Sequence, residues 1–150
     1  MSRFVINISS PRPAVEVFDY MARFSNAALW DPGVAAATDV DGGDVHVGSR
    51  FDLQVRFAGR TLPLRYTVTE LESSGSVVVE AANAFVRSRD RITVRAEGDG
   101  SLLRYEALLE PRGLAWVTAP LLAASFRTIG RRAEAGLRAA LGAVDETVDR

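Results

Sequence analysis

The chain lacks cysteine and lysine altogether, and it has one histidine among 150 residues. Without cysteine, disulfide bonds, thiolate-bound zinc and cysteine nucleophiles are excluded, and a reducing cytoplasm is compatible with the composition. All 18 basic residues are arginines, and 19 acidic residues balance them to a net charge of −1. A nucleic-acid interface needs clustered excess positive charge, so we expect no nucleic-acid partner.

We also expect neither a targeting segment nor a membrane-spanning segment. The N-terminal stretch MSRFVINISSPRPAVEVF has no apolar core ahead of a cleavage site, so we expect no signal peptide. The longest apolar run, residues 113–126, is too short to span a bilayer and contains Pro120. We therefore expect a cytoplasmic protein without an integral membrane segment, and the length favours a single domain over residues 1–150.

The first third of the chain predicts one strand and two helices. Residues 4–8 alternate between apolar and polar side chains, as in a strand. Ser10 stands before a proline, which predicts a helix over residues 11–21 with three apolar side chains on one side, Val15, Phe18 and Met21. The stretch FSNAALWDPGV predicts a second short helix that ends at Asp31, because Pro32 disfavours the helical conformation before it.

The middle of the chain predicts a series of antiparallel hairpins. A two-residue turn at Ala58-Gly59 sets Phe57 opposite Arg60 and gives the pairs Val55–Leu62, Leu53–Leu64, Phe51–Tyr66 and Asp52–Arg65. A four-residue loop over residues 98–101 gives the pairs Ala96–Leu103, Val94–Tyr105, Ile92–Ala107, Asp90–Leu109 and Arg89–Glu110. Both hairpins then have one apolar and one charged face. The charged face receives Arg87, Arg89, Arg91 and Arg95, whereas Arg60 alone among the strand arginines has inward parity.

The last part of the chain predicts one long helix over residues 118–144. A stripe with helical spacing is formed by Leu122, Phe126, Ile129, Ala133, Leu137 and Leu141. Three glycines, Gly130, Gly136 and Gly142, are unfavourable inside a helix. Either another part of the backbone approaches the helix closely at these positions, or the helix is frayed.

Several segments carry a resemblance to a known family. FSNAALWDPGV, VGSRFDLQVRFAGR, LRYTVTELE, DRITVRAEGDGSLLRYEALLEPRGL and APLLAASFRTIGRRAEAGLRAAL stand in the order found in the START-like, or SRPBCC, superfamily. They resemble its bacterial branch of polyketide cyclase/dehydrase and lipid-transport proteins. The resemblance implies an α+β helix-grip fold of order β-α-α-β6-α, in which a seven-stranded curved antiparallel sheet wraps around the C-terminal helix. It also implies an internal, mainly apolar cavity that holds a lipid, polyketide or aromatic molecule.

Candidate site residues are those with inward parity on the strands and on the last helix. The apolar candidates for the ligand wall are Trp30, Phe51, Leu53, Val55, Leu64, Ile92, Val94, Phe126 and Ile129. The polar candidates are Ser88, Asp90, Tyr66 and Tyr105, of which the last three are also candidate acid or base groups. The alternative interpretations are that Asp90 is bonded to water or paired with an arginine near the rim, and that Tyr66 and Tyr105 are ordinary core tyrosines. Trp30 is either a core residue or part of the cavity wall.

Other chemistry is not supported by the sequence. His46 is alone and lies at a predicted turn, so we expect no metal site, and the glycines and serines form no dinucleotide, phosphate-loop or hydrolase motif. No cofactor is expected. Three hypotheses remain: a binder of a hydrophobic small molecule, which we favour, a polyketide or aromatic cyclase or dehydratase, and a protein-interaction module. The protein is expected to be a monomer or a homodimer.

Overall fold

The computed structural model describes residues 2–57, 59–113 and 119–142, without the side chains of residues 119–123. Two helices and a 3-10 turn follow the first strand: β1 (Ser2–Ser10), α1 (Ala14–Ala22), η1 (Phe24–Asn26) and α2 (Ala27–Trp30). Six further strands and a helix complete the order: β2 (Val34–Asp39), β3 (Arg50–Phe57), β4 (Arg60–Glu72), β5 (Ser76–Ala82), β6 (Val86–Glu97), β7 (Gly100–Pro111) and α3 (Ala119–Leu141).

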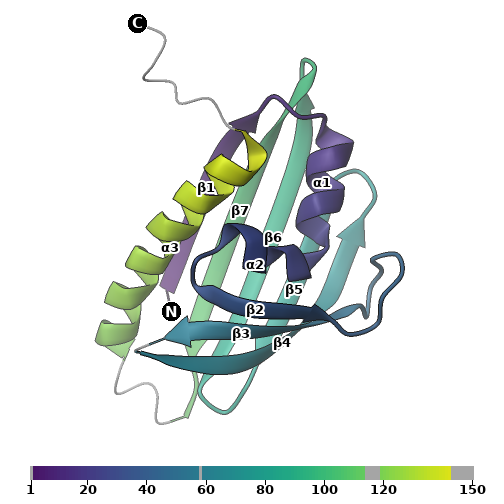
Figure 1. Cartoon of the computed structure of the whole chain (residues 1–150). Coiled ribbons are helices and arrows are strands. Elements are labelled where there is room, and N and C mark those ends of the chain that lie inside the picture. Colours follow the sequence, from purple (N-terminus) through teal and green to yellow (C-terminus); the bar gives the residue numbers. More distant parts are fainter. Residues whose placement is uncertain (1, 58, 114–118, 143–150) are drawn as a thin grey trace, which may run out of the picture.

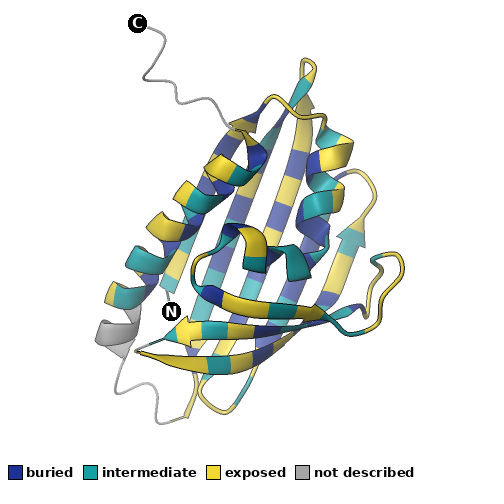
Figure 2. Ribbon diagram, in the orientation of Figure 1, coloured by how far each residue is buried: buried dark blue, intermediate teal, exposed yellow. Residues whose placement is uncertain are grey.

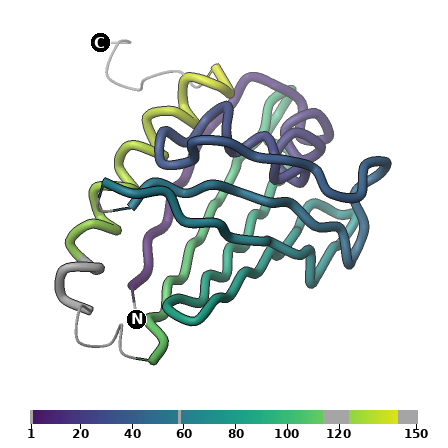
Figure 3. Tube along the Cα trace, turned by 60° about the horizontal axis from the view of Figure 1, so that its bottom comes forward, coloured from purple at the N-terminus to yellow at the C-terminus, as the bar shows by residue number. Residues whose placement is uncertain are grey.

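The seven strands form one antiparallel sheet in the order β1-β7-β6-β5-β4-β3-β2. The sheet curls into a half-barrel, and α3 packs along β1 at one side while α1 packs against β6 and β7 (Figures 1 and 3). Buried and exposed residues alternate along most strands (Figure 2) because successive side chains point to opposite faces. The expected helix-grip architecture is thus confirmed.

The register of the β3–β4 hairpin is confirmed. Phe57 lies opposite Arg60, Val55 opposite Leu62 and Phe51 opposite Tyr66. Gly59 has a φ of 75°, which a tight turn between twisted strands requires, while Ala58 lies outside the described residues. The predicted position of the turn therefore sets this register, because a shift by two residues would also pair apolar side chains on this face.

The predicted register of the β6–β7 hairpin is wrong by two residues. The loop is a two-residue turn, so Ala96 lies opposite Ser101 rather than Leu103, and Asp90 lies opposite Ala107 rather than Leu109. Gly98 adopts a φ of 58° and lets the chain turn two residues earlier than a four-residue loop would. Because the register is shifted by an even number of residues, every side chain keeps its predicted face of the sheet.

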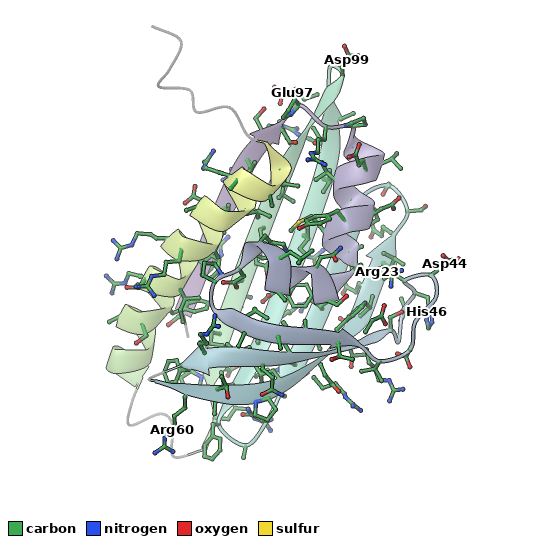
Figure 4. All side chains as sticks on the ribbon, in the orientation of Figure 1. Arg23, Asp44, His46, Arg60, Glu97 and Asp99 are labelled. Carbon is green, nitrogen blue, oxygen red and sulfur yellow. The ribbon has the colours of Figure 1, made fainter. Side chains whose placement is uncertain are left out.

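The charged outer face agrees with the predicted parity. Arg87 lies 3.6 Å from Glu80, and Arg89 and Arg91 lie 3.4 Å and 3.3 Å from the two carboxylate oxygens of Glu70. Arg60, predicted to face inward, is exposed beside the β3–β4 turn, as Figure 4 shows. Its position at the end of the strand lets the long side chain reach water.

The predicted start of α1 is wrong by three residues. The helix begins at Ala14, and the Ser10 hydroxyl donates to the carbonyl of Leu141 at the end of α3 (2.7 Å) instead of capping α1. Val15 is 74% exposed, Phe18 is half-buried, and Met21 is buried as predicted. The buried face of α1 instead contains Val17 and Ala22 beside Met21.

The predicted helix at the end of the chain corresponds to α3, which is shorter than expected. Its predicted stripe is buried at Phe126, Ala133, Leu137 and Leu141 and half-buried at Ile129, whereas the side chain of Leu122 and the whole of Val144 lie outside the described residues. A Cβ added to Gly136 would lie 1.9 Å from the carbonyl oxygen of Trp30, and one added to Gly130 would lie 3.0 Å from the Phe4 ring. Close approach explains these two glycines, while Gly142, with a φ of 64°, follows the last residue of the helix.

Candidate functional site

The concave face of the sheet brings the predicted apolar residues together. Phe51, Leu53, Leu64, Ile92, Val94 and Phe126 are buried there, and Val55 and Ile129 are half-buried. Phe126 of α3 packs on Phe4 of β1, with ring centroids 4.7 Å apart. These side chains supply an apolar surface on which any polar group must find partners within the protein.

Four polar side chains lie together on this face and form one hydrogen-bonded cluster. The Tyr66 hydroxyl donates to the Ser88 hydroxyl (3.0 Å), which donates to one carboxylate oxygen of Asp90 (3.2 Å). The Tyr105 hydroxyl donates to the other oxygen of Asp90. All four residues are at most 6% exposed. We call this group the Asp90 cluster.

Small residues on the intervening strand positions allow the cluster to form. Ser88 pairs with Ala81 on β5, and β5 separates β6 from the strand that carries Tyr66. The alanine methyl leaves room for the tyrosine to extend across the face toward Ser88. Tyr105 lies diagonally from Asp90, whose direct partner on β7 is Ala107. Diagonal neighbours on one face of a sheet lie within reach of aromatic side chains.

The corner at the end of α2 adds two residues beside the cluster. Trp30 is buried and its ring meets the Tyr105 ring edge-on, with centroids 5.5 Å apart. Asp31, the next residue, is half-buried, and its Oδ1 accepts from the backbone N–H of Gly33 (2.8 Å). Trp30 therefore belongs to the core and also touches the polar cluster, while its predicted role in a cavity wall stays a prediction.

Burial changes the acidity of the cluster. It raises the pKa of Asp90 from 3.8 to about 7, although the hydrogen bonds from Tyr105 and Ser88 oppose the shift, and the negative charge of Asp31 adds to it. Burial also raises the pKa of Asp31 to about 6, against the opposing effect of the Gly33 N–H. Desolvation, followed by the charge of Asp90, raises the pKa of both tyrosines. Asp90 thus gains and loses its proton near neutral pH.

Apolar side chains on the concave face become more exposed toward one end of the sheet. Beyond Ser88 and Asp90, the inward positions Val86 and Leu109 are half-buried, as are Val55, Phe57 and Leu62 around the β3–β4 turn. Phe4, which is also half-buried, lies on β1, the neighbour of β7 in the sheet. The Asp90 cluster therefore lies between a fully buried core and a partly exposed apolar surface.

The internal cavity that the resemblance implies is not shown by the described residues. A hollow of about 470 Å³ lies between α1 and the β4–β5 turn and is lined by residues that include Val15, Phe18 and Leu71. A second hollow of about 390 Å³ lies on the charged outer face, where Arg65, Arg87 and Arg112 line it. Neither one contains the Asp90 cluster.

Other sequence-based expectations concern His46, Asp31 and the membrane. His46 lies exposed on the loop between β2 and β3 (Figure 4), and no group of three potential metal ligands occurs among the described residues. Asp31 was interpreted only as the end of a helix, although its position next to Trp30 would have placed it near the site.

Within the described residues, no helix combines the length and apolar character needed to cross a bilayer.

Solved structures with this fold include a START superfamily protein from Mycobacterium smegmatis, which is 13% identical with a TM-score of 0.75, and the match covers 95% of this chain and 98% of that one. The Zhui aromatase/cyclase from Streptomyces sp. R1128 is 10% identical with a TM-score of 0.77, and 93% of each chain is covered. The di-domain aromatase/cyclase BexL from the BE-7585A biosynthetic pathway is 16% identical with a TM-score of 0.61, over 92% of this chain and 47% of that chain.

No curated protein matches the sequence. The family model described as polyketide cyclase/dehydrase and lipid transport matches residues 1–142, which is nearly the whole chain. The chain belongs to the polyketide cyclase/dehydrase and lipid transport family of START-like proteins.

Proposed function

We propose that this protein binds a hydrophobic small molecule, such as a lipid, polyketide or aromatic compound, on the concave face of its sheet. The observation that carries the proposal is the Asp90 cluster, a buried carboxyl group with its hydroxyl partners on an otherwise apolar face. Burial of this carboxyl raises its pKa to about 7 even though both oxygens accept hydrogen bonds, and strongly perturbed titratable groups gather at functional sites. Family membership and the neighbouring aromatase/cyclase structures support the same ligand class.

The half-buried apolar residues beside the cluster are where the body of the ligand would lie. Leu109 of β7 has inward parity at this end, and Leu108 beside it has outward parity, although both are half-buried. A charged side chain at position 109 would occupy the proposed ligand surface. The same change at position 108 would extend toward the outer face, where Leu108 pairs with Arg89.

A fluorescence titration with N-phenyl-1-naphthylamine tests the proposal. The wild-type protein should enhance the fluorescence of this apolar probe in a saturable manner, Leu109→Arg should abolish the enhancement, and Leu108→Arg should retain it. Circular dichroism and thermal unfolding establish that both variants are folded. Absence of saturable binding by the wild type, or equal binding by both folded variants, would contradict the proposal.

Acid–base catalysis is the second candidate function, and the pKa of Asp90 near 7 is the observation that favours it. In the elimination of water from an apolar β-hydroxy ketone, the Asp90 carboxylate would take the α-proton while the carbon–oxygen bond breaks and the carbon–carbon double bond forms. The protonated Asp90 would then return the proton to the departing hydroxide. Substrate and product differ by one water molecule, and Asp90 is regenerated.

Dehydration of 4-hydroxy-4-phenylbutan-2-one, followed by absorbance of the conjugated ketone, measures this reaction. The rate should increase with pH through an apparent pKa near 7 and should be lost in Asp90→Asn. Asp99→Asn, at the tip of the β6–β7 turn (Figure 4), is the matched control because Asp99 is exposed. Turnover that persists in Asp90→Asn would remove Asp90 from the mechanism.

A further inference from the structure

Every hydroxyl hydrogen atom of the Asp90 cluster is donated to another member of the cluster. Each hydroxyl has one hydrogen to donate. Tyr66 donates to Ser88, Ser88 donates to Asp90, and Tyr105 donates to Asp90. Once Asp90 is ionised, the remaining polar capacity consists of lone pairs. A bound molecule therefore meets hydrogen-bond acceptors here, without a free hydroxyl donor in the cluster.

Asp31 adds a second carboxylate beside these acceptors. Its charge contributes to the raised pKa values of Asp90, Tyr66 and Tyr105, which is the effect of a nearby charge within a poorly solvated interior. Trp30, the residue before Asp31, contacts the Tyr105 ring. Gly33, whose N–H binds Asp31, would place a Cβ 3.8 Å from Ile129 of α3. The carboxylate thus lies at the corner where α2, α3 and the cluster meet.

Among the described residues, no cation neutralises either carboxylate. Asp31 receives its hydrogen bond from a backbone N–H, and Asp90 receives its hydrogen bonds from hydroxyls. At the same corner, Arg56 donates to the carbonyl of Pro32 (2.6 Å). Arg65, Arg87 and Arg91 form ion pairs on the outer face of the sheet. An anionic ligand group would therefore lose its hydration and face two like charges without a compensating cation.

We propose that Asp31 and the Asp90 cluster select apolar molecules whose polar group donates hydrogen bonds, such as a hydroxyl, a phenol or a protonated amine, and reject apolar carboxylates. The inference rests on the proposed binding function and specifies the chemistry of its ligand. Asp31 is the more exposed of the two carboxylates, so an incoming polar group would meet it first. Each carboxylate oxygen has more than one acceptor position, so a ligand donor can be added without displacing Tyr105 or Ser88.

Competition by three molecules with the same apolar body tests this selectivity. Decanol, decylamine and decanoate are titrated against N-phenyl-1-naphthylamine bound to the full-length protein at pH 8, above the pKa of Asp31 and Asp90. Decanol and decylamine should displace the probe at concentrations about tenfold or more below that of decanoate, because a hydrogen bond to a charged acceptor is replaced by repulsion. Equal or stronger competition by decanoate overturns the selectivity and leaves the binding function intact. Failure of the probe and all three molecules to bind overturns both.

Substitution of Asp31 tests its own contribution. In Asp31→Asn, the preference for decylamine over decanoate should fall several-fold, while Asp99→Asn at the distant β6–β7 turn should keep the wild-type ratio. Asp31→Ser retains an acceptor for the Gly33 N–H and serves as the second variant if Asp31→Asn is unfolded. A folded Asp31 variant with the wild-type preference overturns the assignment of Asp31 to the site.

Discussion

Replacement of Asp90 by asparagine should change how stability depends on pH. The folded protein holds the Asp90 proton with a pKa of about 7, whereas the unfolded chain releases it near 3.8. Between these values the folded state binds more protons, so the free energy of unfolding decreases as the pH rises. At about 1.4 kcal/mol per pKa unit, ionisation of Asp90 destabilises the folded state by about 4 kcal/mol in total, and about 2.5 to 3 kcal/mol of this falls between pH 5 and pH 8.5.

Urea unfolding from pH 5 to pH 8.5 measures this quantity. Wild type and Asp90→Asn are compared at each pH, and the difference between their free energies of unfolding should change by about 2.5 to 3 kcal/mol across the range. Asp31, with a pKa of about 6, titrates within this range in both proteins, so its own contribution appears in both profiles. Asp41, Asp52 and Glu106 have lowered pKa values because arginine partners stabilise their charged forms, so they titrate below this range. Asp99→Asn should follow the wild-type profile. Parallel profiles for wild type and Asp90→Asn would refute a proton held by buried Asp90.

Three further outcomes follow from the packing. Trp30→Ala should lower the free energy of unfolding by about 3 to 5 kcal/mol in thermal or urea unfolding if Trp30 acts only in the core, whereas a smaller loss together with lost probe binding would assign it to the site as well. Gly136→Ala should destabilise by about 1 to 3 kcal/mol in urea unfolding because its Cβ would meet the Trp30 carbonyl oxygen, and a neutral effect would contradict that contact. Tyr105→Phe removes a donor to the carboxylate and should raise the pKa of Asp90 further, as carbon-13 NMR titration can measure; an unchanged pKa would argue against the hydrogen bond.

The sequence predicted which side chains share a face of the sheet, but it predicted the register of only one of the two hairpins correctly. At the β3–β4 turn, Gly59 marks a two-residue turn and thereby sets the pairing, because a shift by two residues would also match apolar positions. At the β6–β7 turn, Gly98-Asp99-Gly100 is compatible with either a two-residue or a four-residue loop, and both place Asp90 and Tyr105 inward. Alternation of side chains therefore identified the members of the cluster, while the turn geometry determined which of them are diagonal neighbours.

The role of Asp31 and the start of α1 could not be predicted because both depend on contacts between distant segments. Local signals predicted the end of α2 at Asp31, which is its C-cap, but they contain no information on where the carboxylate of Asp31 lies relative to β6. Ser10 has the sequence context of a helix cap, yet its hydroxyl is used by the carbonyl of Leu141. Hydrogen bonds to distant segments compete with local hydrogen bonds for the same polar atoms, and a sequence pattern reveals only the local ones.

The contact between Gly136 and the Trp30 carbonyl has a mechanical consequence. Together with the Ser10 hydrogen bond to Leu141, it fixes the C-terminal half of α3 against the rest of the fold. Ala119 begins the helix 17 residues before Gly136, which at 1.5 Å per residue is about 25 Å along the axis. A tilt of about 10° around the fixed point would therefore displace the backbone at Ala119 by about 4 Å, the width of an alkyl chain. The contacts of Gly130 and Phe126 with the Phe4 ring oppose such a tilt, so the packing of β1 on the middle of α3 determines how far the start of the helix can move from the concave face.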